Sequence, residues 1–217
     1  MHRHYHVHPY AAVVVSGGYE EAGESGRRQV QAGDVLIHPP FSAHCDRVPR
    51  GTNRVLDIPL PFDGREWMPF GRVADPDALV RAAQQDPQSA VPLLIEQFEA
   101  AELALSDLPD QLASALDRTE PPAIAAWAAQ HGVARETLSR SFQSLYQVSP
   151  NRYRIEARAR RAWRTIIAAP LTSLADIAVT CGYADQAHLT RDVAMLTGLT
   201  PGAWRNQKNG TSHSFKT

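Results

Sequence analysis

Histidines near the start of the chain have the spacing of metal ligands. His4, His6 and His8 alternate with other residues, so in a β-strand their side chains would lie on one face. Imidazole nitrogens commonly bind Zn, Ni, Cu or Fe. If a barrel brought His44 against this face, it could hold a divalent transition metal together with His4 and His6. His8 would then be a further effector-binding or metal-binding residue, and the identity of any cofactor stays open.

Other interpretations of these histidines remain open. The pocket could retain the residues without holding a metal, or it could bind a polar organic effector. A histidine-rich terminus also suits a solvated edge strand or a sequence left by cloning. Cys45 is adjacent to His44 but would point to the opposite face of a strand. Cys45 and Cys181 cannot build a disulfide framework, and they fit a reducing cytoplasm.

A second set of functional side chains lies in residues 173–205. Ser173 followed by Asp176 is a capping-box pattern that opens a helix. Gly182 ends that helix because Gly adopts positive φ without a Cβ penalty. Asp185 can cap a second helix. Its inward stripe is Leu189, Val193 and Leu196, and its outward residues are Gln186, Ala187, Thr190 and Arg191.

Helix, tight turn and helix is the helix-turn-helix unit. Gln, Thr and Arg on the outer face of the second helix suit base edges and phosphates in a DNA major groove. An ordinary helical hairpin with a polar outer face would show the same pattern, so a second observation is needed.

That observation is an internal repeat. Ile124, Trp127 and Gly132 lie 50 residues before Leu174, Ile177 and Gly182. The segment Ser149-Pro150-x-x-Tyr153-Arg154 lies 51 residues before Thr200-Pro201-x-x-Trp204-Arg205. The outward residues of the first unit are Arg135, Glu136, Ser139, Arg140 and Gln143. The intervening helix, from Asn151 to about Ala168, would be roughly 27 Å long, which approaches the ~34 Å between successive major grooves.

These residues resemble the C-terminal DNA-binding domain of the AraC/XylS family of bacterial transcription regulators, over about Asp110 to Arg205. The resemblance implies a sequence-specific, cytoplasmic transcription factor that binds double-stranded DNA as a homodimer, with RNA polymerase as a candidate partner and no catalytic residues. Three residues depart from the family pattern: Ala134 replaces a Ser N-cap, Gln147 a Gly, and Val193 a Phe.

Charge supports the DNA-binding interpretation of the C-terminal half. Residues 119–217 hold 12 Lys and Arg against 6 Asp and Glu, a charge of +6, whereas residues 1–118 hold 10 against 17, a charge of −7. The hydrophobic content of 43% is ordinary for a globular chain of 217 residues. Neither a signal peptide nor a membrane-spanning segment is expected.

The N-terminal half predicts short strands. They are Val13–Val15, Arg28–Gln31, Val35–His38 and Val55–Ile58, each bounded by turn residues. Gly33, Pro39 and His44 resemble the second cupin motif, with Phe41 where that motif has Gly. His4-x-His6 and Gly17 resemble the first. We therefore predict an α+β protein: a small cupin-like β-barrel or jelly roll, then an all-α domain with two helix-turn-helix units. The barrel starts late and is expected to be incomplete or closed by a partner chain.

The segment after the strands predicts helices at Asp77–Gln85, Ser89–Ala104 and Asp110–Arg118, after a connector with Pro61, Gly64, Pro69 and Gly71. Val91, Leu94, Ile95 and Phe98 form an apolar stripe that either packs on the barrel or forms a dimer helix. The predicted domains are a cupin-like sensor (1–60), a helical linker or dimerisation segment (61–108), the DNA-binding domain (109–207) and a polar, disordered tail (208–217).

The linker helix is rich in arginine. We expect some of these residues to face phosphates and Arg158 to act as an internal brace. They are Arg152, Arg154, Arg158, Arg160, Arg161 and Arg164. The rival function is a metal-dependent cupin enzyme with a helical appendage. Such enzymes usually use three His and a carboxylate, whereas Glu20 and Glu21 lie beyond the turn of the first motif. A third interpretation, a protein adaptor without DNA, fits this basic helix poorly.

Overall fold

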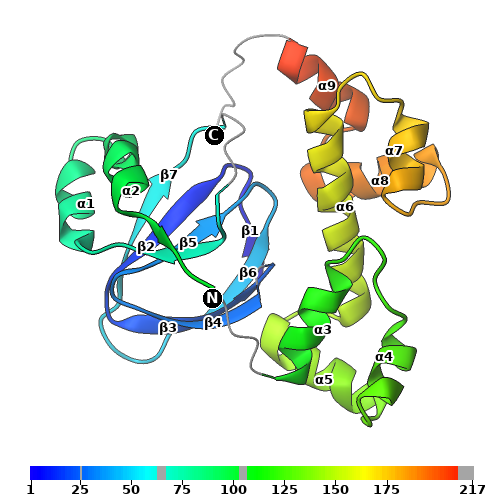
Figure 1. The fold of residues 1–217 in the computed structure, drawn as a ribbon, viewed down its shortest axis with the longest axis horizontal. Helices are drawn as coiled ribbons and strands as arrows, with labels where there is room; N and C mark the ends of the chain where they lie inside the picture. Colours follow the sequence, from blue (N-terminus) through cyan, green and yellow to red (C-terminus); the bar gives the residue numbers. More distant parts are fainter. Residues whose placement is uncertain (25, 63–66, 103–106, 210–217) are drawn as a thin grey trace. The chain divides into compact units, whose positions relative to one another are not determined.

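The structure, a computed structural model, describes residues 1–24, 26–62, 67–102 and 107–209 (Figure 1). It divides into two compact units. The first contains Met1–Gln111 and Ser141–Val148, and the second contains Leu112–Arg140 and the chain from Ser149 onward. The α+β class is confirmed, with strands in the N-terminal part and helices in the C-terminal part.

The strands of the first unit form two antiparallel sheets, ordered β1-β6-β3-β4 and β7-β2-β5-β8-β9. Among the described residues no strand pair joins one sheet to the other, so the predicted barrel is an open pair of sheets. The strand bounds are β1 (His4–Tyr5), β2 (Tyr10–Ser16), β3 (Gly18–Gly23), β4 (Gly26–Gln31), β5 (Asp34–His38), β6 (Ala43–Arg47), β7 (Arg54–Pro59), β8 (Phe70–Arg72) and β9 (Glu99–Ala100).

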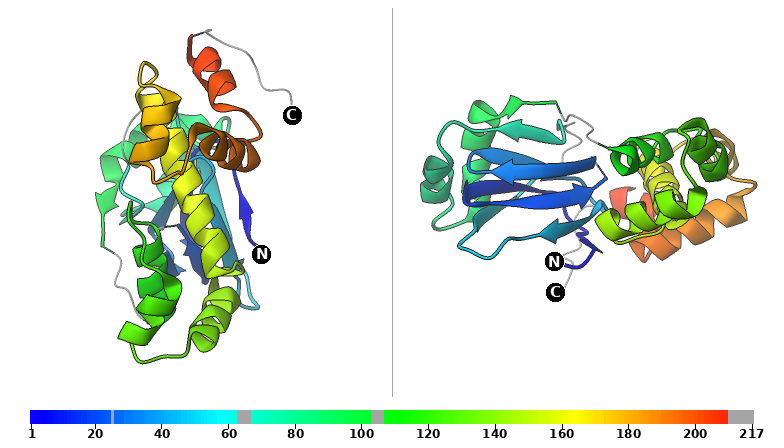
Figure 2. Two further views of the ribbon diagram at one scale, coloured as in Figure 1. Left: turned by 90° about the vertical axis from the view of Figure 1, so that its right-hand side faces the viewer. Right: turned by 90° about the horizontal axis from the view of Figure 1, so that it is seen from below.

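Alternation along β2 builds two apolar clusters. Ala11 and Val13 face one cluster, and Ala12 and Val14 face the other, because neighbouring residues of a strand point to opposite sides. The first cluster continues into the helices α1 (Pro76–Ala82) and α2 (Val91–Gln97), which cover one face of the larger sheet (Figure 2). The second cluster includes Tyr19 of β3.

The segment of residues 61–108 contains more than helices. α2 ends at Gln97, after the one-turn helix η1 (Pro87–Ala90), so the predicted helix from Ser89 is shorter than expected. β8 and β9 then extend the larger sheet. Gly71 of β8 is not part of a loose connector, since a Cβ there would lie 2.5 Å from the ring of Phe98. Gly64 and Ala104 lie outside the described residues.

The apolar stripe of α2 packs largely on the sheet. Leu94 is fully buried in the core, and Val91 and Phe98 are partly buried against it. Ile95 is the exposed member of the stripe, at 39%. The packing interpretation therefore accounts for three of the four residues.

Helices form the C-terminal part of the chain. They are α3 (Leu108–Leu116), α4 (Ile124–Gln130), α5 (Arg135–Tyr146), α6 (Pro150–Ala168), α7 (Leu174–Thr180), α8 (Gln186–Thr197) and α9 (Pro201–Asn209). The helix pairs α4–α5 and α7–α8 are the two helix-turn-helix units. α6 is the single linker helix between them, and its 19 residues span about 28 Å. Residues 210–217 of the predicted tail lie outside the described residues.

Local signals set the helix ends. Ser173 accepts a hydrogen bond from the backbone N–H of Asp176 at 3.0 Å, which confirms the predicted cap of α7. Gly132 and Gly182 have φ of +67° and +72°, as the turns require. Gln147, where the family pattern has Gly, also has positive φ, at +53°. The backbone thus keeps the left-handed turn without the residue that adopts it most readily.

Candidate functional site

The predicted DNA-reading residues lie on the outer faces of α5 and α8. Seven are exposed: Arg135, Glu136, Arg140, Gln143, Gln186, Ala187 and Arg191. Ser139 and Thr190 are half-buried. The opposite face of α8 is buried through Leu189, Val193 and Leu196, as its apolar spacing requires. Contact of the outward residues with DNA stays a prediction.

The N-terminus of α8 leaves the Gln186 side chain available. The carboxylate of Asp185 accepts a hydrogen bond from the backbone N–H of His188 at 2.7 Å and so caps the helix. Gln186 is the first residue of α8 and is exposed. Its carboxamide is therefore not needed as a cap.

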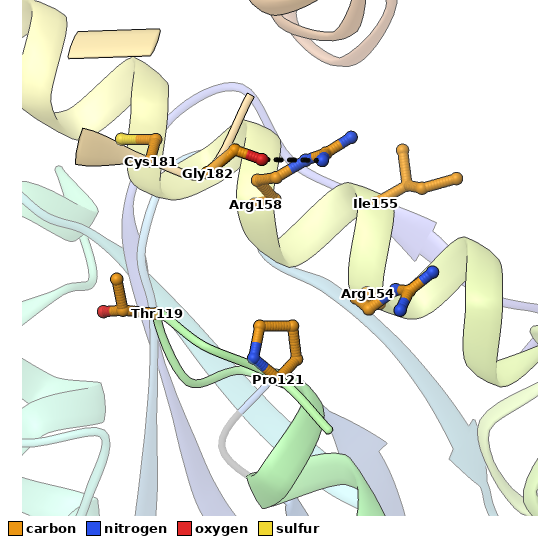
Figure 3. A pocket seen from close by; sticks show the side chains of 7 residues that line it. All are labelled: Thr119, Pro121, Arg154, Ile155, Arg158, Cys181 and Gly182. Atoms are coloured by element: carbon orange, nitrogen blue, oxygen red, sulfur yellow. Dashed lines mark hydrogen bonds between the residues drawn. The ribbon is translucent and has the colours of Figure 1, made fainter. Parts of the chain in front are cut away.

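Arg158 fastens the linker helix to the second unit. Its guanidinium donates to the carbonyl oxygen of Gly182 at 3.2 Å (Figure 3). It also donates to the carboxylate of Asp192 at 3.1 Å. It also lies 3.2 Å from Nε2 of His188 and 4.1 Å from the centre of the Tyr183 ring. The expected inward role of Arg158 agrees with these contacts. Sequence reasoning missed His188 and Asp192 as partners, although their i, i+4 spacing places them on one side of α8.

A cavity of about 270 Å³ lies beside this brace (Figure 3). Thr119 and Pro121 line it from the chain before α4, and Arg154, Ile155 and Arg158 line it from α6, with Cys181 and Gly182 on the turn. Arg158 is paired with Asp192. The other arginine of the cavity, Arg154, donates to the amide oxygen of Asn151 and has no acidic partner within the described part of the chain.

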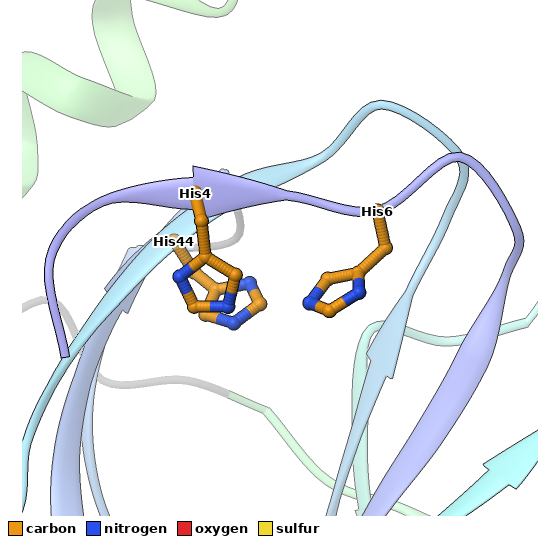
Figure 4. Close-up of side chains that lie close together, drawn as sticks. All are labelled: His4, His6 and His44. Carbon is orange, nitrogen blue, oxygen red and sulfur yellow. The ribbon is translucent and has the colours of Figure 1, made fainter.

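The histidine cluster of the first unit brings together the predicted ligands His4, His6 and His44 (Figure 4). His4 is paired with His44 across β1 and β6. One ring nitrogen from each of the three lies within 4.8 Å of the others. The ring centres of His4 and His44 are 4.3 Å apart, and those of His4 and His6 are 5.0 Å apart. Metal binding by this group stays a prediction.

His8 is not a member of the cluster, and the strand that would continue the alternation ends at Tyr5. The alternation of three histidines on one strand face is therefore wrong for its last member. His8 and His6 instead line a hollow of about 240 Å³ together with Tyr10 and Asp57.

Glu21 and His38, a carboxylate and a further imidazole, extend the histidine cluster toward the interior. Oε2 of Glu21 lies 3.6 Å from Nε2 of His38, and both residues form a group with His44. Glu21 lies beyond the turn of the first motif, as the sequence indicates, but β3 pairs with β6 and brings its carboxylate beside the imidazoles. The Tyr10 ring stacks on His38 at 4.5 Å, and its hydroxyl lies 3.5 Å from Nε2 of His44.

Burial, together with a smaller effect of the neighbouring imidazoles, lowers the pKa of His38 to about 3 and the pKa of His44 to about 2. The two rings are therefore neutral at physiological pH, which is the form that binds metals. Burial raises the pKa of the Glu21 carboxyl well above its usual value, and the nearby Asp46 adds to this effect.

The helix-turn-helix domain family matches residues 127–207. This range begins at Trp127 in α4, includes the recognition helices α5 and α8 together with α6, and ends within α9. Residues 127–207 form a helix-turn-helix domain of the AraC type. The match covers the C-terminal domain, and the function of the whole chain is a matter for proposal. The matched range contains all nine predicted DNA-reading residues.

Several solved structures resemble the chain. A transcriptional regulator with an AraC-type DNA-binding domain from Chromobacterium violaceum is 26% identical, with 43% of this chain and 83% of that chain covered and a TM-score of 0.39. The DNA-binding domain of AdpA, a global transcriptional factor solved in complex with a target DNA, is 26% identical. The match covers 48% of this chain and 95% of that chain, with a TM-score of 0.43. Apo ToxT from Vibrio cholerae is 10% identical. The match covers 94% of this chain and 91% of that chain, with a TM-score of 0.43.

No curated protein matches the chain. Along the described residues, no helix combines the length and apolar character needed to cross a membrane. The AraC-type domain therefore rests on the family match and on the duplicated helix-turn-helix architecture. The histidine cluster lies outside the matched range.

Proposed function

We propose that the chain is a sequence-specific transcription regulator of the bacterial cytoplasm that reads DNA with α5 and α8. The observation that supports this most directly is the AraC-type domain with two helix-turn-helix units on one linker helix. Each recognition helix buries an apolar face and leaves a polar face exposed. The length of α6, about 28 Å, approaches the spacing of successive major grooves.

The exposed residues divide into base readers and phosphate binders. Gln186 and Gln143 have carboxamides that suit adenine, and Arg135, Arg140 and Arg191 suit guanine or phosphate. The net charge of +6 over residues 119–217, from 12 basic and 6 acidic residues, favours association with the phosphate backbone.

The two-sheet part would sense an effector and, in a homodimer, alter how the DNA-binding domains are presented to DNA and to RNA polymerase. The two groups of possible ligands that share His44 support a metal effector, and the hollow beside His6 supports a polar organic effector instead. Both effectors would act in the same part of the fold.

Selection of genomic DNA fragments with the purified protein tests the DNA-reading function. We expect enrichment of a short sequence bound by both recognition helices, and effectors are then screened for a change in affinity at that site. The DNA-reading function is wrong if no fragment is enriched over bulk DNA at low salt.

An enzyme remains the second candidate, because Glu21 supplies the carboxylate that the sequence pattern lacked. Three imidazoles or two imidazoles with a carboxylate can activate water or oxygen at a metal. Reconstitution with Fe(II), Zn or Ni followed by a screen for hydrolysis and oxygen consumption would reveal turnover. The absence of turnover alongside selective DNA binding would favour the regulator.

A further inference from the structure

A second ligand set lies deeper in the histidine cluster and shares His44 with the first. We propose that Glu21, His38 and His44 bind a divalent transition metal between the two sheets. This inner set differs from the one that the motif spacing predicts, since it replaces His4 and His6 by a carboxylate and another imidazole. The proposal is independent of DNA binding, because its ligands lie outside the AraC-type domain.

Burial supports a ligand role for all three residues. Glu21, His38 and His44 are exposed by only 4%, 4% and 3%. They come from β3, β5 and β6, so the set includes strands of both sheets. Polar groups buried this deeply normally have hydrogen-bond partners, because an unpaired one costs roughly 1–3 kcal/mol.

The unpaired atoms are the ones a metal would use. Nε2 of His38 and Nδ1 of His44 are buried and have no hydrogen-bond partner within the described part of the chain. Nε2 of His44 lies 3.5 Å from the hydroxyl of Tyr10, so Nδ1 is the nitrogen of that ring without a hydrogen-bond partner. Each of the two imidazoles therefore has a buried nitrogen without a partner, and a bound metal ion could accept its lone pair.

The spacing of these atoms fits metal coordination. One ligand atom from each residue lies within 4.8 Å of the other two. The 3.6 Å between Oε2 of Glu21 and Nε2 of His38 corresponds to two metal–ligand bonds of about 2.1 Å that enclose an angle of about 120°. Small side-chain movements would bring His44 to the same distance.

The donor set indicates which metals would bind. Two imidazoles and one carboxylate are a common ligand set for Zn and for non-haem Fe(II), with open positions left for water or a small ligand. The carboxylate also offsets part of the metal's charge inside the protein, which a set of three neutral imidazoles cannot do. The outer set lacks this charge, and its His4 and His6 are less deeply buried than the three inner residues.

Co(II) titration of the untagged full-length chain, stripped with a chelator, tests the inner set. We expect one equivalent to bind, with a rise in melting temperature. Glu21→Gln and His38→Gln should each weaken Co(II) binding by at least about ten-fold, since even residues that only support ligands cost 10–100-fold. His4→Gln and His6→Gln should bind as the unchanged protein does, and His131→Gln, in the DNA-binding domain, serves as a control.

The opposite pattern would overturn the inner set. If the His4 and His6 variants lose Co(II) while Glu21→Gln and His38→Gln still bind it, the metal belongs to the outer set. No binding by the unchanged chain overturns any metal site. X-ray absorption of the unchanged chain with Zn does not depend on whether a variant folds. Two coordinated imidazoles support the inner set and three contradict it. Binding to a selected DNA duplex, assayed separately, shows whether the proposed regulator function fails on its own.

Discussion

At the scale of single residues, Gln186 is where a base reader and a structural residue can be told apart. Asp185 already caps α8, so Gln186→Ala should leave the melting temperature unchanged. If Gln186 reads a base edge, the same change should relax preference at one or two base pairs, at a cost of about 1–3 kcal/mol on the selected site. Binding to a library of single-base variants of that site measures this effect.

Asp185→Ala is the matched control for Gln186. It removes the cap and should lower stability by about 1 kcal/mol, while the ranking of DNA sites is unchanged. A Gln186 variant that melts early and ranks sites as before would mean that the side chain supports the helix and reads nothing.

Arg191 lies five residues after Gln186, about 140° around the helix beyond one full turn, so the two side chains point in different directions. Arg191→Ala should weaken binding at all sites. If its partner is a phosphate, the salt dependence of log K should also fall by about one. Binding constants at several salt concentrations test this, and a loss confined to one base position would instead make Arg191 a base reader.

The residues of the histidine cluster show what the sequence could and could not predict. Motif spacing identified His4, His6 and His44, and the register of β1 with β6 brings them together. Glu21 was missed because its position depends on the pairing of β3 with β6, which no local pattern reveals. Strand alternation does not extend to His8, because β1 ends at Tyr5, and a role of His8 in binding an effector stays a prediction.

At the scale of elements, the turn of the second helix-turn-helix unit rests on a left-handed glycine. Gly182 has φ of +72° and open space around a built Cβ, so a substitution there suffers only backbone strain. Gly182→Ala should therefore destabilise the domain by about 1–2 kcal/mol. Gly202 of α9 also has open space but ordinary φ, so Gly202→Ala should be neutral or stabilise by up to about 1 kcal/mol. Urea unfolding of both variants makes the comparison, and equal effects would contradict it.

Helices of this chain were more predictable than its strands for a physical reason. Caps and glycine turns are local, so Ser173, Gly182 and Asp185 fix the ends of α7 and α8 in the sequence itself. β3 and β6 carry charged or polar residues at buried positions, including Glu21 and Asp46, so neither strand shows an apolar pattern. Their burial makes sense only once the two sheets face each other.

At the scale of the whole molecule, charge predicts a steep salt dependence of DNA binding. The affinity should fall by about 0.9 log units per log unit of salt for each phosphate contact, so several contacts give a slope of several units. Titrations of a selected duplex between low and physiological salt measure the slope. A flat response would contradict contacts between the basic residues of the C-terminal half and the DNA backbone.

Self-association of the chain can be tested on α2, where one stripe contains both a core residue and an exposed one. Leu94 is fully buried, so Leu94→Ala should destabilise the two-sheet part by about 2–5 kcal/mol whatever the oligomeric state. Ile95 is 39% exposed, so Ile95→Asp should change the stability of a single chain by no more than about 0.5 kcal/mol. If α2 forms a dimer interface, the buried charge should instead convert the dimer to a folded monomer in analytical ultracentrifugation. A dimer that survives Ile95→Asp would place the interface elsewhere.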